Sequence, residues 1–499
     1  MIRQLNPGSL DDYRAFLKIK SLPTYQIIGR EARFPDEYAR ELGAEKRVHR
    51  FMNWEPSSFL FDYQRDIARI AIRKRKFAIF AAPGMGKTLM MIEFANAAAD
   101  VLSRKGKRTT IVSPLMVIGQ TIQENERWYG RTGRKIIQVR AKDLAAWTQA
   151  DDDGTIGITN YDALTDDIPQ GNLGALILDE SSMLKSMYGK WGQCCIRLGR
   201  GLDWKLCLTG TPAPNDRIEY ANHAVFLDHF PTVNSFLARF FVNRGQTDNR
   251  WEIKPHAIEP FYRALSHWSI FLNDPATYGW RDNVGTLPPI RVHIDEVDLT
   301  QEQRALVRKV TGQLMVTSLG GITSRSQMAQ IAKGNHKGEK VDTLKYEFIR
   351  QLVEREPHRG TIIWARYNAE QDALFESMPG AANVSGDTPV EERITLIEEF
   401  KAGRRRQLIS KAKILGFGLN LQVATRQIFS GLQDSYEEYY QAVKRSNRIG
   451  STEPLDVHIP VTELERPMIE TVLRKAHMIE QDTAEQERIF KKFGMLEIN

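Results

Sequence analysis

The segment KFAIFAAPGMGKTLMM, from Lys76 to Met91, most constrains what this chain can fold into. Phe77 to Phe80 is the apolar run of a buried strand, Pro83 to Gly86 is a turn, and a helix is predicted to begin at Lys87. This order is typical of a phosphate-binding loop, because the backbone N–H groups and the helix N-terminus point at a polyphosphate. The segment therefore predicts a nucleotide-binding α/β domain.

The residue types of this loop assign its chemistry. Lys87 is expected to reach the β and γ phosphates, and the Thr88 hydroxyl to bind magnesium, which predicts ATP and Mg²⁺ as cofactors. The full pattern has glycine where this chain has Ala81. The alternative is a Gly-Lys-Thr helix start in an ordinary α/β protein, but the flanking strand and helix favour the nucleotide. The turn residues expected at the nucleotide are Pro83, Gly84, Met85 and Gly86.

Two later strands are predicted to complete this site. Ala175 to Glu180, ALILDE, delivers two carboxylates at its end: Asp179 to hold magnesium and Glu180 to orient and deprotonate the attacking water. Neither carboxylate is stable at a strand end without a cation or donors nearby. Leu206 to Pro212, LCLTGTP, ends in hydroxyls suited to sensing the γ-phosphate, although hydroxyls also commonly cap helices.

Polar residues near other predicted elements are further candidates. Gln64 starts an amphipathic helix just before the loop, where its amide can pair with the adenine edge or be a surface amide. Thr109 to Pro114 and Ile156 to Tyr161 are predicted parallel strands, and open α/β sheets bind ligands at the carboxyl ends of strands. The candidates for contacting a second substrate, unless they merely close turns, are Ser113, Pro114, Thr159 and Asn160.

The repeated strand, loop and helix predict a doubly wound parallel sheet between about Pro56 and His267. A second α/β pattern without a phosphate loop begins near Pro289, with strands predicted at residues 290–297, 361–364, 407–410 and 425–430. The expected division is an accessory segment at 1–55, a first lobe at 56–288 with a helical extension after about 216, a second lobe at 289–460 and a helical tail at 461–499.

Near the end of the second pattern, Gln441, Arg445 and Arg448 are spaced by four and three residues. A helix would place them on one face. Such arginines form salt bridges only, or they neutralise charge on the γ-phosphate if the two sheets face one another. Arginine suits the second role because it stays ionised and presents a planar fork of donors.

Composition narrows the function classes. The net charge of +7 and a pI near 9.1 favour a polyanionic partner, although each basic cluster is also consistent with a solvated face. Three cysteines without a CxxC pair argue against a zinc module or disulfide framework. No apolar run approaches the ~20 residues of a membrane helix. Without a secretion signal, a cytoplasmic chain is expected, associated with the nucleoid or in host cytoplasm if viral.

Ten motifs in order resemble helicase superfamily two and, within it, the Swi/Snf-type DNA translocases. The resemblance runs from about Phe59 to Gly450. The motifs are DYQ (62–64), APGMGKT (82–88), IVSP (111–114), ITNY (158–161), LDES (178–181), LTGTPAPN (208–215), LPPIRVHIDEVDLTQEQ (287–303), GEKVDTL (338–344), GFGLNLQ (416–422) and QAVKRSNRIG (441–450).

The resemblance implies two RecA-like lobes flanking an ATP cleft, with a C-terminal helical brace. It assigns adenine contact to Gln64, phosphate and magnesium chemistry to Lys87, Thr88, Asp179 and Glu180, and arginine fingers to Arg445 and Arg448. Gly418 and Gln441 are included among the nucleotide contacts. The family grips one strand of duplex DNA mainly through its backbone. By position, the corresponding loops carry Pro114, Asn160, Lys411 and Lys413.

Three positions depart from the family pattern. Ser182 stands where many relatives have histidine, Ser451 stands where glutamine is common, and SIFLNDPATYGW replaces the Arg-Arg-x-Lys signature before Leu287. ATP hydrolysis is still expected, while its coupling to motion is left open by these changes.

The resulting functional hypothesis is an ATP-dependent translocase on double-stranded DNA. The alternatives are a strand-separating or fork-reannealing helicase, and an ATP-gated DNA clamp with little hydrolysis. DNA is the expected partner, and replication, repair or recombination proteins are further candidates.

Overall fold

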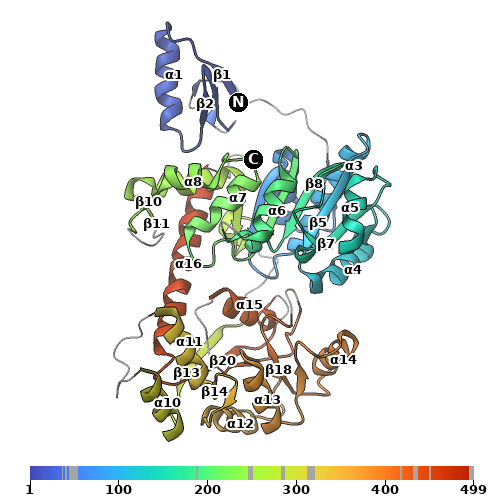
Figure 1. The fold of residues 1–499 in the computed structure, drawn as a ribbon. Helices are drawn as coiled ribbons and strands as arrows, with labels where there is room; N and C mark the ends of the chain where they lie inside the picture. Colours follow the sequence, from blue (N-terminus) through green and yellow to red (C-terminus); the bar gives the residue numbers. More distant parts are fainter. Residues whose placement is uncertain are drawn as a thin grey trace. The chain divides into compact units, whose positions relative to one another are not determined.

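A computed structural model describes residues 1–35, 38–39, 42–43, 54–186, 189–245, 251–281, 287–311, 321–415, 419–430, 436–448 and 451–493. The chain divides into two compact units. Unit 1 comprises residues 1–283 and 480–499, and unit 2 comprises residues 284–479. Each unit contains one large parallel sheet, as Figure 1 shows, so the predicted α/β class with two doubly wound lobes is confirmed.

The sheet of unit 1 has seven strands in the order β12-β4-β9-β8-β5-β7-β6, with every neighbouring pair parallel. This order makes the carboxyl ends of β4, β9, β8 and β5 neighbours at one edge. The strands are β4 (Lys76–Ala81), β5 (Arg108–Ser113), β6 (Ile136–Gln138), β7 (Ile156–Asn160), β8 (Leu173–Asp179), β9 (Trp204–Thr209) and β12 (Ser269–Leu272). Strands β6 and β12 were not predicted from the sequence, because three and four residues carry too little periodicity.

Helices cover both faces of this sheet (Figure 1). Phe80, Val112 and Leu178 turn to the face that carries the main core, and alternate residues turn to the face where α3 packs. The helices are α2 (Asp62–Lys74), α3 (Lys87–Ser103), α4 (Ile118–Tyr129), α5 (Ala141–Gln149), α6 (Lys190–Gly199), α7 (Tyr220–Phe226), α8 (Val233–Phe240) and α9 (Ile258–Trp268).

The aromatic residues after Asp216 belong to this core and are not exposed stacking platforms. Phe236, Phe240 and Phe261 are buried and meet edge to face, with ring centroids 5.3–6.0 Å apart. A two-stranded hairpin of β10 (Phe241–Asn243) and β11 (Trp251–Ile253) lies beyond them. The three cysteines are buried free thiols, as expected.

The first residues form a small module with its own core. Strands β1 (Ile2–Gln4), β2 (Gln26–Ile28) and β3 (Glu31–Arg33) make an antiparallel sheet in the order β1-β3-β2, and α1 (Leu10–Ser21) joins β1 to β2. The core residues include Ile19, Leu22 and Ala32. The module is therefore a folded part of unit 1.

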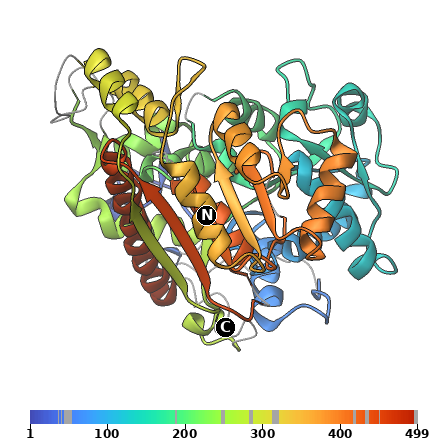
Figure 2. The same ribbon diagram turned by 90° about the horizontal axis from the view of Figure 1, so that it is seen from below.

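Unit 2 holds a six-stranded parallel sheet in the order β13-β20-β19-β16-β18-β17. The sequence prediction lacked β17 and β20, and β20 is the strand that pairs with both β13 and β19. Figure 2 shows β13 and β20 side by side. The strands are β13 (Ile290–Glu296), β16 (Thr361–Ala365), β17 (Ala382–Val384), β18 (Gln407–Lys411), β19 (Arg426–Phe429) and β20 (Leu455–Val461).

Helices and one small hairpin surround the second sheet. The hairpin pairs β14 (Asn335–His336) with β15 (Glu339–Lys340). The helices are α10 (Gln301–Thr311), α11 (Gly321–Ala332), α12 (Lys345–Arg355), α13 (Asn368–Ser377), α14 (Val390–Lys401), α15 (Tyr436–Ser446) and the long α16 (Arg466–Phe493). Ile469 and Val472 of α16 join the core of unit 2, whereas Ile489 of the same helix joins the core of unit 1.

A buried cluster of charged side chains connects the ends of several helices in unit 2. Glu465 accepts from Lys333 at 3.0 Å and from Lys345, and it also accepts from the Thr462 backbone N–H at 3.1 Å. Lys345 donates in addition to the Ser430 carbonyl at 2.9 Å. Burial by itself would raise the pKa of Glu465, but the two ammonium groups hold it below its ordinary value. The cluster thus joins the end of α11 and the starts of α12 and α16.

We expect Glu465→Gln to destabilise unit 2 by about 3 to 5 kcal/mol, because two buried ammonium groups lose their counter-charge. Urea unfolding, followed by a probe in unit 2, measures this loss. Glu463→Gln is the matched control, since Glu463 is exposed and 4.0 Å from Arg304, and it should change the free energy of unfolding by less than about 0.5 kcal/mol. Equal stability of the two variants would contradict the structural role of the cluster.

A second prediction concerns the end of α16. Asp482 accepts from Arg217 Nε at 2.9 Å and from the Tyr262 hydroxyl at 2.9 Å, all within unit 1. We expect Asp482→Ala to destabilise unit 1 by about 2 kcal/mol, because the half-buried Arg217 guanidinium and the buried Tyr262 hydroxyl lose their acceptor. Thermal unfolding measures the loss. The control Glu485→Ala removes only an exposed pair with Arg488 and should have little effect.

Candidate active site

The phosphate loop joins β4 to α3 through two glycines in left-handed conformation. Gly84 has φ 94° and Gly86 has φ 70°, where an L side chain is strained. A Cβ atom on Gly86 would lie 2.2 Å from the Gln64 amide nitrogen. The backbone conformation and this close approach both require glycine at position 86, so the loop has the form that its sequence predicts.

The Lys87 side chain folds back over the end of β4. Its Nζ donates to the Ala81 carbonyl at 2.7 Å. Gly210, just after β9, lies against the same loop, because a Cβ atom on it would be 3.3 Å from Pro83 Cδ and 3.7 Å from Lys87 Nζ. The LTGTP motif and the phosphate loop are therefore in contact.

Asp179 ends β8 with its carboxylate almost fully buried, at 8% exposure. One oxygen accepts from the Ser113 hydroxyl at 2.8 Å, and the other accepts from the Glu180 backbone N–H at 3.1 Å. Burial raises the pKa of Asp179, while the Ser113 hydroxyl and the Lys87 charge oppose the rise. A buried carboxylate beside a phosphate loop fits a magnesium ion, which binds through one or two carboxylates together with phosphate oxygens.

Glu180 adopts a left-handed backbone conformation, with φ 49°, which is uncommon for a residue with a side chain. Its Oε2 accepts from the Thr209 hydroxyl at 3.2 Å, and that hydroxyl accepts in turn from the Thr211 backbone N–H at 3.2 Å. Thr209 thus connects the carboxylate of β8 to the LTGTP turn after β9. A left-handed backbone of this kind persists only where surrounding contacts hold it, and the Thr209 hydrogen bond is one such contact at the end of β8.

Gln64 is buried at the start of α2, with 3% exposure. Its Oε1 accepts from the Phe61 backbone N–H at 3.0 Å, and its Nε2 donates to the Met85 carbonyl at 3.4 Å. The amide therefore lies on the phosphate loop and is not a surface amide. Adenine contact by Gln64 stays a prediction.

The four predicted nucleic-acid contacts of unit 1 differ in exposure. Ser113 and Thr159 are fully buried, and Pro114 is buried as well, while Asn160 is partly exposed. Because the Ser113 hydroxyl is bonded to Asp179, it belongs to the nucleotide side of the edge. Burial argues against direct DNA contact by the side chains of Ser113 and Thr159.

In unit 2, the predicted arginines lie in the last turn of α15 and just after its end. Arg445 is in the helix and 5% exposed, and its carbonyl accepts from the Leu421 backbone N–H at 3.0 Å. Helix α15 ends at Ser446, so the expectation that Arg448 shares a helical face with Gln441 and Arg445 is wrong. The helix stops there because the Ser451 hydroxyl contacts the Ser446 carbonyl and the Arg448 backbone N–H, which turns the chain.

The other predicted residues of unit 2 lie near this turn or near the end of β18. Gln441 donates to Glu437 at 3.3 Å, and Gly418 falls outside the described residues. Lys411 ends β18 and bonds to Asn368 Oδ1, while Lys413 pairs with Glu438 at 3.4 Å and is exposed. DNA contact by the two lysines stays a prediction.

Sequence reasoning missed two groups at the edge of the first sheet. The Tyr161 hydroxyl donates to the Asp179 carbonyl at 2.7 Å, and its position directly after β7 is the signal that was available. His223 Nε2 lies 3.0 Å from the Ser181 hydroxyl, and burial lowers the pKa of His223 to about 4, so the ring is neutral at pH 7. No sequence motif links His223 to this edge, because it comes from α7.

The described residues contain no group of three or more His, Cys, Asp or Glu side chains arranged to hold a metal ion. Within the same ranges, every helix is too short or too polar to traverse a bilayer.

Comparisons with known proteins agree with this arrangement of motifs. The SNF2-related domain family matches residues 74–357, and the helicase conserved C-terminal domain matches residues 344–450. The mouse protein named DNA annealing helicase and endonuclease ZRANB3 is 24% identical over 438 residues, covering 80% of this chain and 38% of the relative. The bovine protein of the same name is 23% identical over 431 residues with the same coverage.

The chain thus spans about 38% of the length of these curated relatives. Among solved structures, the Sulfolobus solfataricus SWI2/SNF2 ATPase core in complex with dsDNA is 19% identical, with a TM-score of 0.41, covering 90% of this chain and 98% of that one. The family matches cover the phosphate loop, the Asp179-Glu180 pair, Arg445 and Arg448. The chain therefore belongs to the SNF2-related domain family, the Swi/Snf type of superfamily two helicases, whose enzyme class is that of DNA-dependent ATPases and helicases.

Proposed function

We propose that this chain hydrolyses ATP to translocate along double-stranded DNA. The observation that carries the proposal is the set of contacts at the edge of the first sheet. There the phosphate loop, the Asp179-Glu180 pair and Thr209 are joined by hydrogen bonds and close contacts. A carboxylate pair beside a phosphate loop suits hydrolysis, because a protein that only binds nucleotide has no need of a positioned base.

Each residue at this edge has a separate role in the proposed hydrolysis. Thr88 and Asp179 would hold magnesium, which when bound neutralises charge on the phosphates. Lys87 exchanges its contact with the Ala81 carbonyl for the phosphates. Glu180 accepts a proton from the attacking water, and the Thr209 hydroxyl orients the carboxylate that does so. Ser113 holds Asp179 from the other side.

Thr209 also couples the position of the Glu180 carboxylate to the turn that follows β9. Its hydroxyl binds Glu180 and receives the Thr211 N–H, so a shift of Glu180 alters the turn that carries Gly210. We propose that this turn responds to the presence or absence of the γ-phosphate.

The second unit contributes the positive charge that this reaction requires. Arg445 and Arg448 are assigned as the groups that neutralise charge developing on the γ-phosphate, with Gln441 and Gly418 as further nucleotide contacts. The Leu421 N–H bond to the Arg445 carbonyl ties this arginine to the neighbouring NLQ segment. Closure of the two units around ATP is part of the proposal.

DNA is bound mainly through its phosphates, so sequence preference is weak and affinity falls steeply with salt. The contacts are assigned to the loops that carry Pro114, Asn160, Lys411 and Lys413 at the carboxyl ends of strands, where the buried Pro114 marks its loop and supplies no side-chain contact. Replication, repair or recombination proteins are proposed as further partners.

A second candidate function is fork reannealing or strand separation. The name of the relatives, DNA annealing helicase and endonuclease, favours it. Two kinds of assay separate translocation from these activities. Displacement of a triplex-forming strand reports translocation, whereas reannealing or unwinding of a forked duplex reports the alternatives. A third candidate, an ATP-gated clamp with little hydrolysis, would show no product in single-turnover hydrolysis with DNA bound.

We expect duplex DNA to raise the rate of ATP turnover, and Lys87→Ala or Glu180→Gln to lower the stimulated rate by about 100-fold or more, because each removes a group that acts on the reacting phosphate or water. Steady-state phosphate release with duplex, single-stranded DNA and RNA at several salt concentrations measures this. Lys105→Ala, an exposed lysine of the same unit, is the control and should keep full turnover. Equal turnover with and without nucleic acid would remove the proposal.

Thr209→Val is predicted to lower DNA-stimulated turnover about 5-fold, as loss of one hydrogen bond of about 1 kcal/mol to Glu180 implies. Thr132→Val makes the same change at an exposed threonine of the same unit, between α4 and β6, and is the matched control. The control should stay within about twofold of the parent rate. Identical rates for both variants would mean that Thr209 does not orient Glu180.

A further inference from the structure

One side chain of α7 contacts two strands at the active-site edge of the first sheet. His223 is fully buried, and its Nε2 lies 3.0 Å from the hydroxyl of Ser181, just after β8. The His223 ring also meets the Phe80 ring of β4 edge to face, with centroids 5.3 Å apart. Strands β4 and β8 are not neighbours, because β9 lies between them. A single imidazole therefore connects the ends of two separated strands.

Both contacts of His223 fall next to groups of the proposed reaction. Phe80 immediately precedes the residue whose carbonyl accepts from the Lys87 ammonium group. Ser181 immediately follows Glu180, the proposed base. The ring thus contacts the strand end that leads into the phosphate loop and the turn that presents the carboxylate.

Side chains of α7 hold the turn that follows Glu180. This turn is a short 3-10 helix, η5 (Ser181–Leu184). At its far end the Leu184 carbonyl accepts from Asn222, and at its first residue the hydroxyl contacts His223. Glu180 has φ 49°, and a left-handed residue of this kind persists only where its surroundings hold it. The His223 contact holds the backbone on the side opposite the Thr209 hydrogen bond.

The His223 ring acts here as a hydrogen-bond partner and not as a proton carrier. Burial lowers the pKa of His223 to about 4, so the ring is neutral at pH 7. It packs against Phe80 of the main hydrophobic core, where a polar ring costs free energy unless it is hydrogen-bonded. A leucine would pack there without that cost. What the imidazole supplies, and leucine would not, is the bond with Ser181.

We propose that His223 is a positioning residue for ATP hydrolysis, which holds the turn at Glu180 through the Ser181 hydroxyl. The inference rests on the proposed function, because it takes Glu180 as the base. Loss of the bond would let the turn relax and displace the Glu180 carboxylate from the attacking water. Lys87 and Thr88, which are assigned to bind the phosphates and magnesium, would keep their places.

We expect His223→Leu to lower kcat of DNA-stimulated turnover about tenfold and to leave KM for ATP within about twofold, because the base is displaced and the phosphate-binding groups are not. Leucine is close in size and keeps the apolar contact with Phe80. His223→Gln should restore about half of the parent kcat or more, since its amide carries both a donor and an acceptor for Ser181. Phosphate release against ATP concentration at saturating duplex DNA measures both constants.

A double-mutant cycle tests whether His223 acts through Ser181. Ser181→Ala should lower kcat by a factor similar to that of His223→Leu. The combined variant should stay within about twofold of the slower single variant, because the same interaction is removed by either change. Thermal unfolding of each variant is followed in parallel, so that a general loss of stability is recognised.

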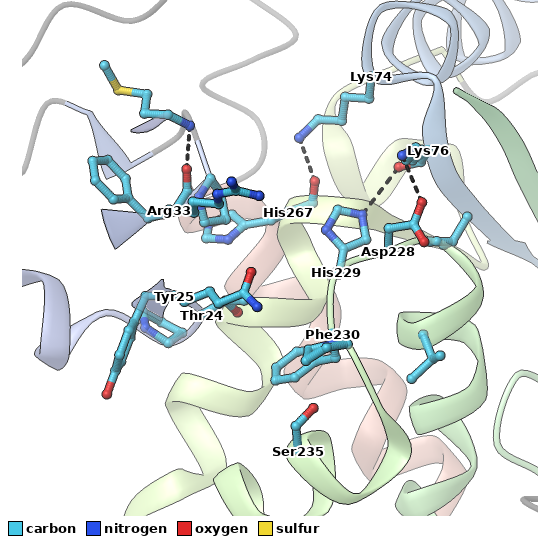
Figure 3. A pocket seen from close by; sticks show the side chains of 18 of the residues that line it. Thr24, Tyr25, Arg33, Lys74, Lys76, Asp228, His229, Phe230, Ser235 and His267 are labelled. Carbon is cyan, nitrogen blue, oxygen red and sulfur yellow. Dashed lines mark hydrogen bonds and ion pairs between the residues drawn. The ribbon is translucent and has the colours of Figure 1, made fainter. Parts of the chain in front are cut away.

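The matched control is His267→Leu, the same change at another buried histidine of unit 1. His267 is 8% exposed and lines a cavity of about 1400 Å³ where the N-terminal module meets the rest of the unit (Figure 3). Residues Arg73 to Lys76, at the end of α2 and the start of β4, line the same cavity. The His267 ring meets the Tyr38 ring of the module with centroids 4.3 Å apart. The control should keep the parent kcat even where it lowers stability.

A parent-like kcat in His223→Leu would overturn the inference. Losses that multiply in the combined variant, no recovery in His223→Gln, or an equal loss of kcat in His267→Leu would overturn it too. Each of these results is read in a parent that duplex DNA stimulates. A parent without that stimulation contradicts the proposed function itself, and the role of His223 falls with it, so the two failures are distinguishable.

Discussion

Charge buried at the carboxyl edge of the first sheet is the constraint on which the rest of unit 1 depends. The Asp179 carboxylate loses most of its hydration there. It is stabilised by hydrogen bonds from the Ser113 hydroxyl and the Glu180 N–H and by the nearby charge of Lys87. Each partner comes from a different strand or loop. The strand order β4-β9-β8-β5 brings these strand ends together, so the chemistry of the site depends on the topology of the sheet.

Unit 2 also contains a buried carboxylate, which is stabilised by two lysines. Glu465 stands between Lys333 and Lys345, and the cluster holds the starts of α12 and α16 where β19 and β20 end. Arg445 of α15 is positioned by a backbone hydrogen bond from the Leu421 N–H to its carbonyl. Rigid element ends of this kind let a few side chains be presented in a fixed geometry, which phosphate chemistry requires.

Much of this could be predicted because the informative residues are local in sequence. The strand, glycine turn and helix at 76–91 form one continuous segment, and the buried strand before Asp179 is another. Strands β6, β12 and β17 could not be predicted, because three or four residues carry too little periodicity. Strand β20 has seven residues, but it contains Pro460, and a proline within a run argues against a central strand. The exit of Arg448 from α15 depends on Ser451, a contact that helical spacing ignores.

By itself, the sequence determined the α/β class, the phosphate loop and the identity of the acidic pair, since each follows from residue types at short spacing. Only the tertiary structure decided that Ser113 serves Asp179, that Thr209 reaches Glu180, and that the Arg73–Lys76 run lines a cavity with the N-terminal module. The physical reason is that burial and hydrogen-bond partners join residues far apart in the chain, and strand order, which no local pattern encodes, sets which of them meet.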